Sequence, residues 1–223
     1  MRLRLEGVAC RHDGHAPLFS GVDLEIDGGD FVLLSGPSGS GKSSFLRLLN
    51  LLDAPSAGRV LVDGQVPAPS SIPAFRRRAT LVQQTPEVHE GSVRDSLVYP
   101  FSFKAARNHH PPERAALRAL LDSLLLDEVD LDEDAGPLSV GQRQRLALAR
   151  ALCAGPEFLL LDEPTAALDD RAAHAVEALL EARCAEEGVG IVLVSHRPFA
   201  ARHVRPRRLL LADGALKEEP WAS

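Results

Sequence analysis

Three runs of consecutive apolar residues, at 31–34, 158–161 and 191–194, are the strongest pattern along the chain. Unbroken apolar runs of this length, without alternation, are typical of parallel strands that are covered on both faces. The first residues, 1–6, instead alternate between apolar and charged side chains, as in a strand with one solvent face. The pattern therefore predicts an α/β protein built on a buried parallel sheet.

The first run leads into a glycine-rich loop. Residues 36–44 read Gly-Pro-Ser-Gly-Ser-Gly-Lys-Ser-Ser, and the segment that follows, 45–49, has helical character. This order of strand, loop and helix is what G-x-x-x-x-G-K-[ST] requires, because backbone N–H groups and a helix N-terminus together surround phosphate oxygens. The predicted nucleotide-binding residues of this loop are Gly36, Ser38, Gly39, Ser40, Gly41, Lys42, Ser43 and Ser44.

Two residues of the loop have distinct expected roles. Lys42 can reach the β and γ phosphates, and the Ser43 hydroxyl can ligate Mg²⁺. The alternative interpretation is an ordinary Ser/Gly surface turn. Since Gly makes up about 7% of average sequences, chance produces the pattern in roughly one chain in a hundred of this length, so a P-loop is the favoured interpretation.

The second and third runs also end in polar residues. Asp162 and Glu163 follow 158–161, at the strand end where α/β sheets bind ligands. Asp162 is suited to hold Mg²⁺ through water, and Glu163 to orient or deprotonate an attacking water; capping of the next helix is the alternative. His196 follows 191–194 and can donate to a γ-phosphate, or be purely structural.

A second anion cradle is predicted at residues 138–152. The segment reads as a cap followed by an amphipathic helix, with Leu146, Ala149 and Cys153 facing inward. Ser139 and the amides of the next two residues can contact an anion. This second anion site is far along the chain from the glycine-rich loop at 36–44. A ligand that contacts both sites is therefore hard to bind within one subunit.

The segment 138–142 resembles the signature motif of the ABC ATPases, and other motifs agree with that family in order. Lys42 and Ser43 match Walker A, Gln84 the Q-loop, Asp162 and Glu163 Walker B, residues 167–169 the D-loop, and His196 the switch histidine. The resemblance implies ATP and Mg²⁺ as cofactors, with Glu163, His196 and Gln84 catalytic, and with Ser43, Gln84 and Asp162 at the metal. It also implies a head-to-tail dimer in which Ser139, Gly141 and Gln142 contact the ATP held by the other copy.

The same resemblance predicts the fold class. It implies a P-loop NTPase with a RecA-like core, residues 1–84 and 152–223, an antiparallel β edge, and an inserted α-helical signature subdomain, residues 85–151. Two positions depart from the family pattern. Val140 replaces the usual second glycine of the signature, and His12 aligns with the aromatic residue that stacks on adenine. His12 is either that stacking residue or an ordinary exposed histidine.

Composition limits the functional classes. The formal net charge of −6 gives no general attraction for nucleic acid, and the arginine-rich stretch 197–208 lacks aromatics, so it is interpreted as a solvated helix and turn before the last strand. The three cysteines lack metal or disulfide spacing, which suits a reducing compartment. No run approaches the roughly 20 apolar residues of a membrane span. We therefore expect a cytoplasmic subunit, peripheral at the inner face of the membrane through a permease partner.

Residues 83–86 and 92–101 resemble a small bacterial group associated with iron efflux, which is similar to the ATPase of plant aluminium-tolerance transporters. The leading hypothesis is transport through separate membrane subunits, and this finer resemblance implies iron efflux. The sequence of the ATPase does not itself reveal the substrate or the direction, because the ATPase contacts partner helices and not the cargo. The rival hypothesis is a soluble ABC ATPase that acts on nucleic acid or ribosomes, although such proteins carry a long coiled coil or two ATPase domains. A P-loop kinase or GTPase would leave the signature, the acid pair and His196 unexplained.

Overall fold

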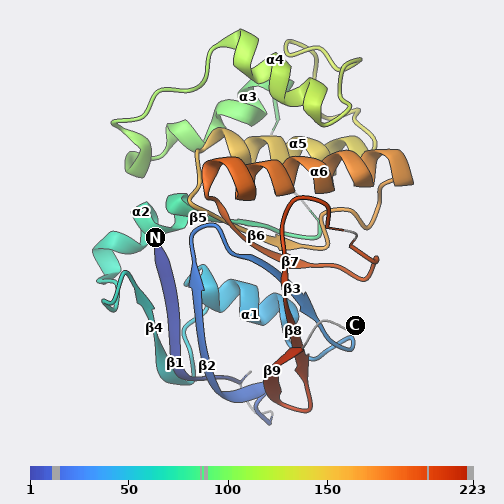
Figure 1. The fold of residues 1–223 in the computed structure, drawn as a ribbon. Coiled ribbons are helices and arrows are strands. Elements are labelled where there is room, and N and C mark those ends of the chain that lie inside the picture. Colours follow the sequence, from blue (N-terminus) through green and yellow to red (C-terminus); the bar gives the residue numbers. More distant parts are fainter. Residues whose placement is uncertain (12–15, 86, 88–89, 200, 220–223) are drawn as a thin grey trace.

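The computed structural model describes residues 1–11, 16–85, 87, 90–199 and 201–219, which form two sheets and their covering helices (Figure 1). A three-stranded antiparallel sheet has the order β2-β1-β4, and a six-stranded sheet has the order β5-β6-β7-β3-β8-β9. The strands are β1 (Arg2–Cys10), β2 (Phe19–Asp27), β3 (Phe31–Ser35), β4 (Ala57–Val62), β5 (Ala79–Val82), β6 (Phe158–Asp162), β7 (Gly190–Val194), β8 (Arg207–Ala212) and β9 (Ala215–Glu219).

The three apolar runs form strands, β3, β6 and β7, as the pattern predicts. The three strands are consecutive in the larger sheet, in the order β6-β7-β3. All pairs from β5 to β8 are parallel, and β9 pairs antiparallel to β8. Side chains alternate between two cores: Val32 and Leu34 belong to one, and Phe31 and Leu33 to the other. The runs are unbroken because both faces of these strands are buried.

The helices form layers on both sides of this sheet (Figure 1). Helix α1 lies between the two sheets, whereas α5 and α6 run over the opposite face, with α3 and α4 beyond them. The helices are α1 (Lys42–Leu49), α2 (Ile72–Arg78), α3 (Val93–Val98), α4 (Arg114–Ser123), α5 (Val140–Cys153) and α6 (Asp170–Glu187), with the 3-10 turns η1 (Pro69–Ser71), η2 (Tyr99–Ser102) and η3 (Lys104–Ala106). No helix in the described ranges has the length and apolarity to span a membrane.

The fold class predicted from the sequence, an α/β P-loop core with an antiparallel edge and a helical insertion, is confirmed. Helix α5 begins after Ser139, and the expected inward residues Leu146, Ala149 and Cys153 are all buried. It ends at Cys153, so it crosses the expected subdomain limit at 151.

The interpretation of residues 197–208 is wrong. The described residues at 197–199 and 201–206 form no helix, and the strand that follows, β8, is not the last, because β9 succeeds it. Instead, the segment is held by Glu181, a buried carboxylate of α6 that accepts the backbone N–H groups of Arg202 and His203. Its shape depends on this long-range contact, which local sequence does not reveal.

Candidate nucleotide and catalytic site

The P-loop connects the end of β3 to the start of α1. Gly36 has φ 149°, and a Cβ there would lie 2.2 Å from the carbonyl oxygen of Leu211. Gly41 occupies the N-cap of α1 with φ 99°, a left-handed value that other residues rarely adopt. The loop therefore needs glycine at these two positions, because one has no room and both have unusual backbone angles.

Two polar groups of the loop indicate its ligand. Lys42 is 8% exposed, and its Nζ donates to the carbonyl oxygens of Gly36 at 2.9 Å and Pro37 at 3.0 Å. The Ser40 Oγ is buried and has no hydrogen-bond partner among the described residues. Buried polar groups are normally paired, so an unpaired hydroxyl beside a buried ammonium in a glycine loop fits the oxygens of a phosphate group.

Two of the three residues expected at Mg²⁺, Ser43 and Asp162, come from neighbouring elements, and the third, Gln84, follows β5. Ser43 lies in the first turn of α1, and Asp162 ends β6, in register with Val194 of β7. No group of three His, Cys, Asp or Glu residues in the described part of the chain could hold a metal ion by itself. Mg²⁺ at nucleotide sites takes only one or two protein carboxylates, with phosphates and water completing its shell. Ser43 and Asp162 therefore fit an ion that arrives with the nucleotide.

The three residues with expected catalytic roles form one hydrogen-bonded cluster. Gln84 Nε2 donates to Glu163 Oε2 at 3.1 Å, and His196 Nε2 lies 3.1 Å from Glu163 Oε1. The Glu163 side chain is 19% exposed and that of His196 is 54% exposed. These residues follow β5, β6 and β7, which end at the same edge of the sheet. The cluster is open to solvent on one side, where a substrate could approach.

Glu163 has a strained backbone. Its φ is 51°, in the left-handed region, and it precedes Pro164, a position where helical angles are disfavoured. Such a conformation costs about 1–3 kcal/mol and persists only where the surroundings enforce it. The Glu163 N–H donates to the carbonyl oxygen of Val194 at 3.0 Å, which ties the turn to β7.

The signature residues form a helix cap in a different layer from the P-loop. Ser139 Oγ accepts from the Gln142 N–H at 3.2 Å, and Gln142 Oε1 accepts from the Ser139 N–H at 2.9 Å. Val140 is 59% exposed, and a Cβ at Gly141 would lie 3.2 Å from the carbonyl oxygen of Ala167. Helices α1 and α5 cover opposite faces of the sheet (Figure 1), so the two predicted cradles belong to different layers of one chain.

The sequence interpretation overlooked Gln144. This side chain is 2% exposed; its Nε2 donates to the Glu163 carbonyl oxygen at 2.9 Å, and its Oε1 accepts from the Ala167 N–H at 3.3 Å. Hydrophobic periodicity gives no signal for a polar residue buried between a helix and a turn. By contrast, His12, the expected adenine contact, lies outside the described residues.

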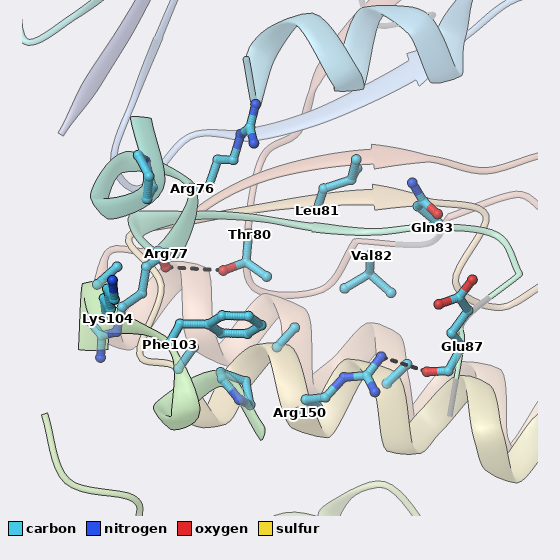
Figure 2. Close-up of a pocket in the computed structure, with 16 residues that line it drawn as sticks. Arg76, Arg77, Thr80, Leu81, Val82, Gln83, Glu87, Phe103, Lys104 and Arg150 are labelled. Atoms are coloured by element: carbon cyan, nitrogen blue, oxygen red, sulfur yellow. Dashed lines mark hydrogen bonds between the residues drawn. The ribbon is translucent and has the colours of Figure 1, made fainter. Parts of the chain in front are cut away.

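A groove of about 850 Å³ opens between β5, α2, the η2–η3 segment and α5 (Figure 2). Its cationic lining residues are Arg76, Arg77, Lys104 and Arg150, and Glu87 is its acidic residue. Burial lowers the pKa of the Arg77 and Arg150 guanidinium groups, and the Arg77 Nε is buried without a hydrogen-bond partner in the described chain. Gln83 also lines the groove, next to Gln84 of the catalytic cluster.

Comparisons with known proteins show the family of the chain. Residues 19–166 match the family described as ABC transporter. The chain is 35% identical to Protein STAR1 of Oryza sativa subsp. japonica, covering 97% of this chain but 62% of that protein, and 35% identical to the histidine/lysine/arginine/ornithine transport ATP-binding protein HisP of Salmonella typhimurium, covering 94% and 85%. It superposes on a dimeric, ADP- and Pi-bound structure of the ATP-binding cassette MJ0796 with a TM-score of 0.82 and 29% identity over 99% of both chains. The chain therefore belongs to the ABC transporter family, as one of its ATP-hydrolysing cassettes.

Proposed function

We propose that this chain binds Mg-ATP on residues 36–44, hydrolyses it with Glu163 as general base, and so drives transport through separate membrane subunits. The observation that carries the proposal is the cluster of Gln84, Glu163 and His196 after β5, β6 and β7, which lie on one side of the P-loop strand β3. Phosphate release by the purified chain, measured with and without Mg²⁺, tests the activity. Release that does not depend on Mg²⁺ or on Lys42 would contradict it.

The proposed mechanism assigns one task to each residue. Lys42 exchanges its two carbonyl partners for phosphate oxygens, and the unpaired Ser40 hydroxyl donates to the same group. Mg²⁺, when bound beside Ser43 and Asp162, neutralises charge on the phosphates. Glu163 accepts the proton of the attacking water, while Gln84 and His196 hold its carboxylate in place.

We further propose that two copies pair head to tail, so that Ser139, Gly141 and Gln142 of one copy contact the ATP held by the other. The location of α1 and α5 in different layers supports this arrangement, since the two cradles are separate within one chain. The dimeric MJ0796 cassette, which aligns over 99% of this chain, supports it as well. In this proposal residues 85–151 act as the helical signature subdomain.

We expect the region 84–103 to dock a cytoplasmic helix of the membrane subunit, because the Q-loop joins the ATP site to the helical subdomain. The proposed docking surface is the groove of Figure 2, which borders this region at Glu87, Pro100 and Phe103. Its position suits coupling, because Gln83 lines it and Gln84 contacts Glu163. A photo-crosslinker at Phe103, which is 52% exposed in the groove, should capture the permease in membranes. Val66, which is 60% exposed beyond β4, is the matched control position. Capture at Val66 and not at Phe103 would contradict this docking surface.

Iron export is the proposed transport function, and the proposed location is the cytoplasmic face of the membrane. Similarity to STAR1 supports the subgroup assignment, but HisP shares the same 35% identity. The test first identifies the membrane protein that crosslinks to the chain. It then measures iron efflux from cells with and without the intact ATPase. Iron export would be contradicted if the crosslinked partner were a solute importer. Transport itself would be contradicted if ribosomes or DNA were recovered with the chain instead of a membrane protein.

A further inference from the structure

We propose that Gln144 is a positioning residue for hydrolysis, which fixes the turn that carries Glu163 against the signature helix. This inference rests on the proposed role of Glu163 as the general base. Gln144 is 2% exposed, so its amide is out of water and must find partners within the fold. It finds both of them in one turn, at Glu163 and Ala167.

The first partner is the strained residue itself. The Glu163 carbonyl oxygen accepts from Gln144 Nε2 at 2.9 Å and from the Ala166 N–H at 3.2 Å, while its own N–H donates to Val194 at 3.0 Å. Its φ of 51° directs the side chain toward Gln84 and His196. Because an unfavourable backbone conformation relaxes when its supports are removed, loss of the Gln144 bond allows the carboxylate to move.

The second partner connects the turn to the signature. Gln144 lies one helical turn after Gly141, where an added Cβ would lie 3.2 Å from the Ala167 carbonyl oxygen. Gln144 Oε1 accepts from the N–H of the same Ala167. The first turn of α5 and the 163–167 turn therefore pack as one unit. If contact with the nucleotide of the other copy shifted the signature helix, the Gln144 amide would transmit that shift to Glu163 of the same chain.

The test uses two single substitutions of Gln144, each by a residue of similar size. Gln144→Met removes both hydrogen bonds, and Gln144→Glu retains an acceptor for Ala167 but cannot donate to Glu163. Misplacement of a reacting group by about 1 Å costs on the order of 10²-fold in rate, so we expect both variants to lose about that factor in kcat. Affinity for a fluorescent ATP analogue should stay within about twofold, because no phosphate-binding residue has changed.

The matched control is Asn50→Leu. Asn50 is also a buried amide, 3% exposed, and its Nδ2 donates to the Ala79 carbonyl oxygen at the end of α1 distant from the P-loop. This variant should unfold several degrees lower, with an unchanged kcat per folded molecule. If Gln144→Met behaves in the same way, the residue is structural only and the inference is overturned. If Glu163→Gln, measured in parallel, hydrolyses ATP at the wild-type rate, the proposed role of Glu163 as general base fails.

Discussion

Glu163→Gln separates nucleotide binding from hydrolysis. The substitution keeps the size of the side chain and leaves the P-loop intact, but an amide cannot take up the proton of the attacking water. Locally, it replaces one carboxylate oxygen by an NH₂ group, which faces either Gln84 Nε2 or His196 Nε2, both 3.1 Å from the native carboxylate. An NH₂ group that faces Gln84 places two donors against each other, whereas one that faces His196 can donate to Nε2 of the neutral imidazole tautomer that accepts there.

The two consequences differ in size. A lost hydrogen bond costs about 0.5–1.5 kcal/mol of stability, and less where water replaces it. Lost acid–base catalysis lowers a rate by about 10²–10⁴-fold, which corresponds to about 3–5 kcal/mol in the barrier. Hydrolysis should therefore fall far more than stability, and Lys42 and Ser43 should still bind Mg-ATP.

The assay combines phosphate release with size-exclusion chromatography and light scattering. ATP that is not hydrolysed should persist between the P-loop of one copy and the signature of the other, so Glu163→Gln should accumulate as a dimer with Mg-ATP, unlike the wild type. Ser139→Arg in the same background should abolish the dimer while each monomer retains ATP. Because Ser139 also caps α5, at a cost of about 1 kcal/mol when lost, circular dichroism should confirm that the helix persists.

Two results would refute this reasoning. Hydrolysis by Glu163→Gln at the wild-type rate would mean that the general base is another group. A dimer that survives Ser139→Arg would mean that the signature does not contact the nucleotide of the other copy, even if Glu163 is assigned correctly.

Three further predictions concern the P-loop and the cysteines. Lys42→Ala, which removes the buried ammonium, should lose most affinity for a labelled ATP analogue and nearly all hydrolysis while circular dichroism stays native. Gly36→Ala should lower the melting temperature as well as nucleotide binding, because the new Cβ would lie 2.2 Å from the Leu211 carbonyl oxygen; unchanged melting would contradict the close approach. Burial raises the pKa of the Cys153 thiol to about 12 and that of Cys184 to about 11, so both should stay protonated and resist a thiol reagent at pH 8, and react fully once the chain is unfolded in denaturant.

Local signals explain what could be predicted from the sequence. The runs at 31–34, 158–161 and 191–194 predict β3, β6 and β7, because strands buried on both faces need an apolar residue at every position. The cap at Ser139 was also predictable, since it depends on residues three positions apart. Each of these two patterns spans only a few consecutive residues.

Other features depend on which segments meet in space. Residues 197–208 were expected to form a helix and turn, but Glu181 of α6 accepts hydrogen bonds from the backbone of Arg202 and His203 instead. In the sequence, Gln144 resembles any polar residue of an amphipathic helix. In the structure it is buried, and its side chain bonds to Glu163 and Ala167. The cationic groove likewise combines β5, α2, η3 and α5, which are separated along the chain.

The sequence by itself determined the P-loop, the strand ends that carry Asp162, Glu163 and His196, and the family to which these motifs belong. Each is a local pattern with a local physical cause, such as the need for glycine beside a phosphate. Only the tertiary structure decided the strand order β5-β6-β7-β3, which places Glu163, after β6, between Gln84 and His196. Strand order and the pairing of buried polar groups arise from packing between distant segments, and no short stretch of sequence encodes them.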